Sequence, residues 1–453
     1  MNQIRVRMYR QDDIGDCFLL SFPKSEGMSH MLIDYGVLKG TEDGKARMQA
    51  IVRDIAKTTN GRLDVLVVTH EHWDHVSGFL QAESEFKQLS IGEVWLAWTE
   101  KTGDILADQL REQRAKARKT VDAARQKLKF SAAPGASTAL KALDSLRLFD
   151  GELDVAGGYS TAAAMTWVRE KTGAPVRFLN PGEEPLTIPG TDSMRVFVLG
   201  PPKDVTLLKQ SEPNKQTPEV YQLARETDLG FSAALLDERL KGVDSGRPFD
   251  SSFEMPIAKA KEDSFFRKFY YSADKWRQIE LDWLGTAERL ALQLDSDTNN
   301  TSLALAIELV DNGHVLLFPG DAQVGNWRSW EPLEWAVKDR NGEPMKVKSK
   351  DLLSRTVLYK VGHHASHNAT LRENGLELMQ NPELTAMIPV YEVQADKQGK
   401  DGWEMPFGPL LTRLHDKTAG RVIRADTGVP DMWPAGMVAM PIQNDLYIDI
   451  STT

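Results

Sequence analysis

The sequence predicts a layered α/β fold, on the evidence of two kinds of pattern. Four short apolar runs with strand character end abruptly in polar or ionisable residues, at 31–34, 64–75, 314–321 and 356–364. Continuous apolar runs are typical of strands that are covered on both faces, and layered α/β folds bind ligands at the loops beyond strand ends. Between the second and third runs the chain carries mainly helical patterns.

The second run ends in the strongest chemical signal of the chain. After the apolar stretch come His70, His72, Asp74 and His75. These positions cannot share one face of a helix, because residues i and i+2 of a helix point apart. In an extended segment His70 and His72 can point the same way, and the turn that follows can aim Asp74 and His75 at a second point nearby. Two ligand pairs indicate two metal ions; the alternative is a polar strand end followed by a turn.

The middle of the chain is predicted to be mainly helical. Apolar residues recur at helical spacing from about 104 to 129, and the segment 111–129 holds eight basic and two acidic residues. This charge run indicates either a solvated helix face or an electrostatic guide for an anionic substrate. Further helices are expected at 217–240 and 276–294, loops at 151–160 and 242–252, and a strand near 194–200.

Composition restricts the classes of protein and of metal site. With 453 residues, 41% of them hydrophobic and 26% charged, the chain reads as an ordinary soluble globular protein and not a collagenous, disordered or coiled-coil one. No apolar run reaches the roughly 18 residues of a membrane span, and the first residues lack a secretory signal, so a cytoplasmic protein without membrane contact is expected. The single cysteine excludes thiolate clusters, so histidines and carboxylates would hold any metal.

Net charge gives a weaker restriction. The formal charge of −10 argues against a permanent nucleic-acid coat. It averages a balance of +6 over 111–129 and −16 elsewhere, which leaves an anionic substrate open.

The pattern HxHxDH at 70–75 resembles the ligand motif of the metallo-β-lactamase superfamily. Asp34 in MLIDYG is similar to the first acidic residue of that family, and Asp321 in LLFPGDA is similar to its metal-bridging carboxylate. Within the superfamily the chain most resembles the hydrolase domain of ComEC-type competence proteins and its stand-alone relatives. The segments that carry this resemblance are IGDCFLLSF, NNTSLALAI, LLFPGDA and KVGHHAS at 360–366, where Ala365 replaces the glycine of the KxxHHGS motif.

The resemblance implies a fold and a ligand set. We expect a four-layer αββα sandwich in one domain, 1–453, built from 1–100 and 299–453, with 101–298 as a mainly helical insertion that contains the strand near 194–200. The expected metal ligands are His70, His72 and Asp321 at one site, and Asp74, His75, Asp321 and His364 at the other. Catalytic roles are expected for Asp74, for Asp34 in orienting the ligand loop, and for His363 as a proton donor. The family's usual third histidine of the first site is missing, because no histidine occurs from 76 to 313 and the region 196–204 offers only Asp204.

Neighbouring residues are expected to support this site. Asp16 and Ser366 should make turn or supporting hydrogen bonds. His367 is expected to face solvent, and Lys360 to be either exposed at its strand end or in contact with a phosphate.

The expected function is a metal-dependent phosphodiesterase or nuclease. It would use a hydroxide that bridges two divalent transition metals, Zn²⁺ in the first place and Mn²⁺ as the second choice. The partner would be an anionic phosphoester or a nucleic acid. The alternatives are a β-lactamase- or lactonase-type hydrolase of an amide or ester, and a non-catalytic scaffold that binds a protein partner.

Overall fold

A computed structural model gives the fold over most of the chain. It describes residues 3–129, 136–150, 159–170, 172–211, 255–271, 290–339, 341–398, 402–433 and 441–452. The chain divides into two compact units. The first comprises Met1–Arg111, Arg147–Gln222 and Asp295–Thr453, and the second comprises Glu112–Leu146 and Leu223–Leu294.

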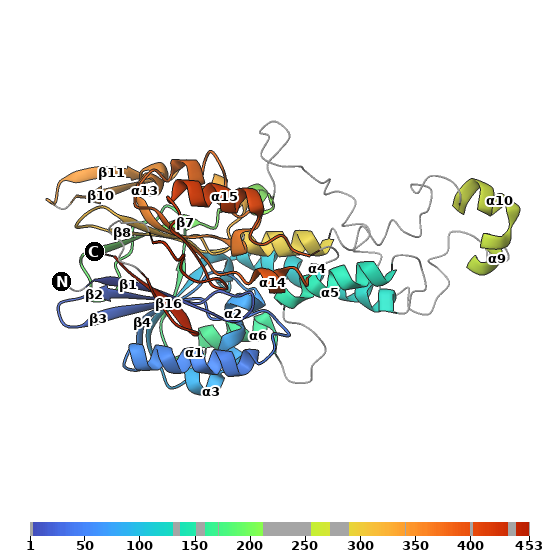
Figure 1. Ribbon diagram of the computed structural model, residues 1–453, viewed down its shortest axis with the longest axis horizontal. Coiled ribbons are helices and arrows are strands. Elements are labelled where there is room, and N and C mark those ends of the chain that lie inside the picture. Colours follow the sequence, from blue (N-terminus) through green and yellow to red (C-terminus); the bar gives the residue numbers. More distant parts are fainter. Residues whose placement is uncertain are drawn as a thin grey trace. The chain divides into compact units, whose positions relative to one another are not determined.

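The first unit contains two large β-sheets (Figure 1). The eight-stranded sheet runs in the order β15 (Ile442–Gln443), β16 (Tyr447–Thr452), β1 (Ile4–Tyr9), β2 (Phe18–Pro23), β3 (Met28–Ile33), β4 (Arg62–Val68), β5 (Ser90–Ala97) and β6 (Val176–Leu179). The six-stranded sheet runs in the order β14 (Val422–Arg424), β13 (Thr385–Ile388), β12 (Thr356–Lys360), β9 (Val315–Phe318), β8 (Ala304–Leu309) and β7 (Met194–Gly200). A separate hairpin consists of β10 (Glu334–Lys338) and β11 (Pro344–Lys348).

The two sheets share one apolar core. Along β2 the side chains of Phe18 and Leu20 belong to a core that also holds Leu305 of the other sheet, whereas Leu19 points to the opposite side. Phe18 packs edge-on against Phe318, with 5.6 Å between the ring centroids. This alternation, with both faces of the strand buried, is the reason that the strands appear in the sequence as continuous apolar runs.

Helices cover the other face of each sheet (Figure 1). On the eight-stranded sheet these are α1 (Gly44–Thr58), α2 (Trp73–Gln81), α3 (Glu83–Phe86) and α6 (Thr161–Glu170). On the six-stranded sheet they are α12 (Val324–Arg328), α13 (Ser349–Ser354), α14 (Glu392–Ala395) and α15 (Gly408–Lys417). The short helix α7 (Val205–Leu208) follows β7.

The second unit is helical in its described residues. The long helix α4 (Ile105–Lys129) begins in the first unit and continues into the second, as α5 (Ala136–Asp150) does in the reverse direction. Val121, Leu128 and Leu143 belong to the core of the second unit. Its other described helices include α9 (Ile257–Glu262) and α10 (Ser264–Phe266).

The predicted elements can be compared with these bounds. The mixed α/β class is confirmed, and the four apolar runs form β3, β4, β9 and β12. The strand near 194–200 is β7, and the helix expected at 104–129 is α4. The helix at 217–240 and the loop at 242–252 lie outside the described residues, as does most of the loop at 151–160; of 276–294, residues 290–294 are described and helical.

The segment expected as one insertion, 101–298, is divided between the two units. Residues 147–222 belong with the sheets, because β6 pairs with β5 and β7 pairs with β8. The charge run of α4 also differs from a simple solvated face. Its lysines 116, 119, 127 and 129 are exposed, but Arg114 and Arg118 are buried.

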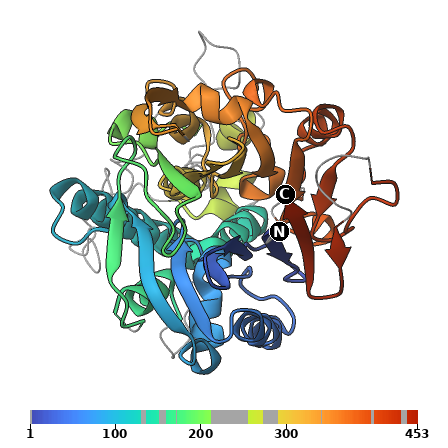
Figure 2. The ribbon, with the colours of Figure 1, turned by 90° about the vertical axis from the view of Figure 1, so that its left-hand side faces the viewer.

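Strand direction brings distant segments to one edge of the first unit. The neighbours β3, β4 and β5 are parallel, and so are β9, β12 and β13. Their carboxyl ends are followed by Asp34, by the segment 69–75, by Asp321 and by 363–364. The first and last long strands, β1 and β16, lie side by side in the same sheet (dark blue and dark red in Figure 2). Among the described helices, none is long and apolar enough to cross a membrane.

Candidate metal centre

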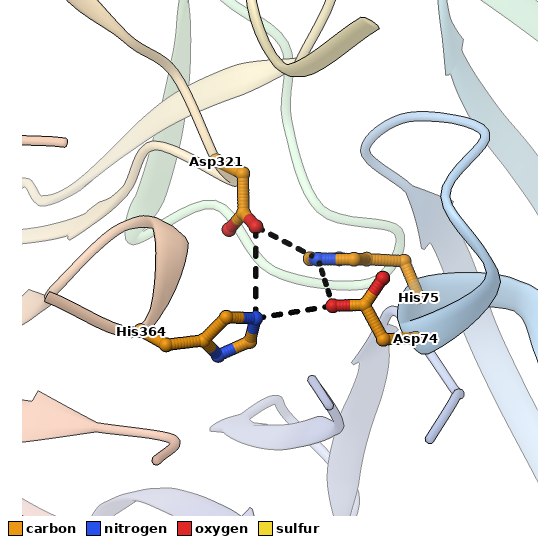
Figure 3. Close-up of side chains that lie close together, drawn as sticks. All are labelled: Asp74, His75, Asp321 and His364. Carbon is orange, nitrogen blue, oxygen red and sulfur yellow. Dashed lines mark hydrogen bonds and ion pairs between the residues drawn. The ribbon is translucent and has the colours of Figure 1, made fainter. Parts of the chain in front are cut away.

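Four buried side chains from these strand ends form a compact cluster (Figure 3). The ligand atoms of Asp74, His75, Asp321 and His364 all lie within 4.8 Å of one another. His75 Nε2 is 3.1 Å from Asp321 Oδ2, and His364 Nε2 is 3.0 Å from Asp74 Oδ2. These are the four residues expected at the second metal site. Two imidazole nitrogens and two carboxylate oxygens are donors that suit Zn²⁺ and related transition ions.

The two histidine rings of the cluster are anchored through their outer nitrogens. His75 Nδ1 lies 2.8 Å from Asp34 Oδ2, and His364 Nδ1 lies 2.7 Å from the carbonyl oxygen of Pro389. A carbonyl oxygen only accepts, so His364 Nδ1 must carry the proton, and its Nε2 is directed at the carboxylates. Metal-binding histidines characteristically have such a partner on the outer nitrogen. The residues present therefore fit a metal ion.

The carboxylates set the charge of both rings. Burial alone would lower the pKa of His75, but the charges of Asp321 and Asp74 outweigh it and hold that pKa well above its usual value. For His364 burial is likewise opposed by the hydrogen bond with Asp74, and the pKa is raised. Without an ion, protonated rings therefore face the carboxylates. The cluster requires positive charge at its centre, and a divalent ion supplies it.

The other predicted histidines, His70 and His72, form a pair of their own. His70 Nε2 is 3.1 Å from His72 Nδ1, and the ring centroids are 4.7 Å apart. Thr69 Oγ1 donates to Asp34, so the contact of 3.1 Å between that oxygen and His70 Nδ1 places the ring proton on Nδ1. Burial, followed by the charges of His75 and His72, lowers the pKa of His70 well below its usual value. The pair lies beside the four-residue cluster, with 4.2 Å between the ring centroids of His70 and His75.

Backbone contacts hold the loop that carries these ligands. Asp34 accepts hydrogen bonds from the backbone N–H of Thr69 (2.8 Å) and from its hydroxyl (2.7 Å). A β-carbon on Gly36 would lie 2.5 Å from the carbonyl carbon of Asp74, so only glycine allows this approach. The loop ends at His72, whose extended backbone precedes α2. Asp34 thus contacts both the start of the loop and His75.

Lys360 is part of the centre, which corrects both expectations for it. The side chain is only 1% exposed. Its ammonium group donates to Asp321 Oδ1 and to the carbonyl oxygen of Gly320, each at 2.9 Å, and forms an ion pair with Asp16. Two buried carboxylates draw the lysine inward, because a buried charge needs a partner of opposite sign. Asp16 has a buried, charged role in place of a simple turn bond.

The ring of His363, the expected proton donor, is buried among neutral polar groups. Its Nδ1 lies 2.7 Å from Ser366 Oγ, and its Nε2 lies 3.4 Å from Asn299 Nδ2. Burial lowers the pKa of His363 to about 3, so the ring is neutral at pH 7. His367 is exposed, as expected.

The turn at 363–365 directs two adjacent rings apart. His363, His364 and Ala365 all have left-handed backbone angles, with φ of 43°, 52° and 63°. His364 enters the four-residue cluster, whereas the ring of His363 lies beside Asn299. The geometry therefore agrees with His364, and not His363, as the ligand.

One predicted neighbour lies elsewhere, and two residues of the site escaped sequence reasoning. Asp204 is an exposed cap of α7 that accepts from the backbone N–H of Thr206 at 2.8 Å. Instead, Asp295 lies 3.7 Å from His72 Nε2 and accepts from Asn299 Nδ2 at 3.2 Å. The only local signal was a run of acidic and amide residues, DSDTNN, ahead of β8.

No protein-family model matches this chain, and a comparison with curated proteins finds none that matches it.

Proposed function

We propose that the chain is a metal-dependent hydrolase with the metallo-β-lactamase fold, similar to the ComEC-like branch. Two sheets packed face to face, with helices on their outer faces, are compatible with a four-layer αββα sandwich. One observation carries the proposal. His75 and His364 are held by their outer nitrogens while their inner nitrogens face Asp74 and Asp321 within 4.8 Å.

The chain offers ligands for one ion and two further nitrogens for a second. Asp74, His75, Asp321 and His364 would hold the first ion, and His70 with His72 would contribute to a second one that shares Asp321. Zn²⁺ and Mn²⁺ both suit nitrogen and oxygen donors without thiolates. When bound, such ions lower the pKa of a coordinated water and stabilise negative charge on the substrate.

A phosphodiester is the proposed substrate class. The cleft residues around His363 can donate neutral hydrogen bonds, from Asn299 Nδ2 and Ser366 Oγ. A bound phosphate would bring negative charge beside the neutral His363 ring and raise its pKa from about 3, which favours a proton on that ring. His363 would then supply the proton that the departing alkoxide needs.

A substrate panel with metal analysis tests the proposal. Purified protein is expected to hold at least one transition ion and, with Zn²⁺ or Mn²⁺, to cleave bis-p-nitrophenyl phosphate and at least one of single-stranded DNA, double-stranded DNA or RNA. Asp74→Ala should abolish both properties. Asp204→Ala, which removes an exposed carboxylate from the cap of α7, should change neither.

The alternatives predict different results in the same experiment. Turnover of nitrocefin or a lactone alone would make the phosphodiesterase proposal wrong and favour the amide or ester hydrolase. Less than one transition metal per chain, together with no turnover, would favour the scaffold.

A further inference from the structure

The two oxygens of Asp321 have different partners. Oδ1 accepts hydrogen bonds from the Lys360 ammonium and from the backbone N–H of His363, each at 2.9 Å. Oδ2 lies 3.1 Å from His75 Nε2 and 3.9 Å from His364 Nε2. Only Oδ2 is therefore directed into the four-residue cluster.

Lys360 has no N–H left for a substrate. An ammonium group has three N–H donors. Three acceptors surround this one: Asp321 Oδ1, the Gly320 carbonyl oxygen and Asp16 Oδ2. Because every donor has an acceptor and the side chain is buried, Lys360 does not meet a phosphate directly.

Asp16 ties this lysine to the rest of the centre. Its backbone N–H donates to the carbonyl oxygen of Asp74 at 3.0 Å, and its carboxylate is as buried as that of Asp321. Oδ2 of Asp16 also lies 3.9 Å from His75 Nδ1. The lysine thus bridges two buried carboxylates and offsets charge where Asp34 and Asp74 also lie close by.

We propose that Lys360 is a positioning residue for the metal centre. Its ammonium, held by Asp16, occupies Oδ1 of Asp321 and leaves Oδ2 as the single oxygen offered to a metal ion. The inference rests on the proposed function in one respect, namely that a metal ion binds the cluster. Groups that orient metal ligands typically change metal affinity by about 10- to 100-fold when they are removed.

Metal titration of Lys360→Met tests this role. After chelation, wild-type and variant protein are titrated with Zn²⁺ and with Mn²⁺, and the dissociation constant is measured. We expect binding about 10- to 100-fold weaker in the variant. The absorption spectrum of Co²⁺-loaded protein should also change, because Asp321 can then turn and offer both oxygens.

The chain contains a matched control for loss of a buried cation. Arg7 is 4% exposed and donates to both oxygens of Asp449 at 2.7 Å, while it also pairs with Asp54. Arg7→Met should lower the melting temperature and leave metal affinity and the Co²⁺ spectrum unchanged. A purely structural role for Lys360 would give the same result in Lys360→Met.

A second variant covers the case in which Lys360→Met does not fold. Asp16→Asn keeps the shape of the side chain but weakens its hold on the ammonium, and it should reduce metal affinity by a smaller factor. Wild-type affinity in a folded Lys360→Met, or in Asp16→Asn if the lysine variant is unfolded, would overturn the inference alone. Failure of the unchanged protein to bind any ion would overturn the proposed function together with the inference.

Discussion

The two pairs of histidines in the centre differ in what they face. His75 and His364 face carboxylates, and the carboxylates hold their pKa values above the usual range in spite of burial. His70 faces His72, and burial lowers its pKa well below that range. All four rings are buried, so burial does not decide their charge. The neighbouring carboxylates decide it, and they make the four-residue cluster the part of the centre that is ready for a cation.

The largest expected effect is that of Asp321→Asn. This change removes the negative charge opposite His75, His364 and Lys360. We expect metal affinity to fall by more than about 100-fold, beyond the range for supporting residues. Metal content after gel filtration measures this. Asp64→Asn is the control, since Asp64 is equally buried but binds His30 N and Arg62; retention of full metal content by Asp321→Asn would contradict the assignment.

The next effect separates the two pairs directly. His364→Ala should leave less than one ion per chain, because it removes a member of the ready cluster. His70→Ala should retain about one ion per chain, because the cluster is intact. Metal analysis of the two variants at equal protein concentration tests the comparison, and equal losses in both would show that it is wrong.

A smaller effect should appear in the pH dependence of stability. The raised pKa values of His75 and His364 stabilise the metal-free fold fully below their unfolded value of about 6.5, and this contribution is lost as pH rises through the folded values. A bound ion replaces these protons, so the difference in melting temperature between metal-loaded and metal-free protein should grow from pH 6 to pH 8. At the acid end Asp74 and Asp321, whose pKa values are lowered, lose their contribution below about 3.8. Thermal unfolding with and without chelator measures both limbs, and a constant difference from pH 6 to 8 would contradict the proposed charge states.

The smallest effect concerns the turn that carries His364. Ala365 has φ of 63°, a left-handed angle that an alanine adopts at a cost. Ala365→Gly should raise the free energy of unfolding by about 1 kcal/mol. Chemical denaturation measures this gain. Ala419→Gly, at another left-handed alanine with φ of 50°, serves as the control outside the centre and should give a similar gain; a loss of stability at 365 alone would mean that the turn needs its side chain.

The sequence predicted the parts of this centre that follow local rules. The segment 70–75 and the residues Asp321 and His364 were recognisable because ligand types directly followed apolar runs. The burial of Lys360 was not predictable, because a lysine at a strand end is usually solvated, and its two carboxylate partners lie far away in the chain. Asp295 escaped for the same reason: its distance to His72 depends on how distant segments pack.

The division of the chain illustrates the same limit. The helical pattern of 104–129 and the strand near 194–200 could be predicted from periodicity. The return of 147–222 to the sheets depends on the pairing of β6 with β5, which no local pattern specifies. Which of His363 and His364 enters the cluster likewise depends on three successive left-handed residues.

The sequence separation within the cluster has a consequence for the order of events during synthesis. Asp74 and His364 are 290 positions apart, and His75 and Asp321 are 246 positions apart. Contacts of such long range form slowly, and a domain generally folds as a unit as the chain leaves the ribosome. The ligands from 70–75 emerge early and await their partners until β12 has been made. A growing chain thus presents only half of the centre to the metal ions of its surroundings, and the choice of ion is made by the nearly complete fold.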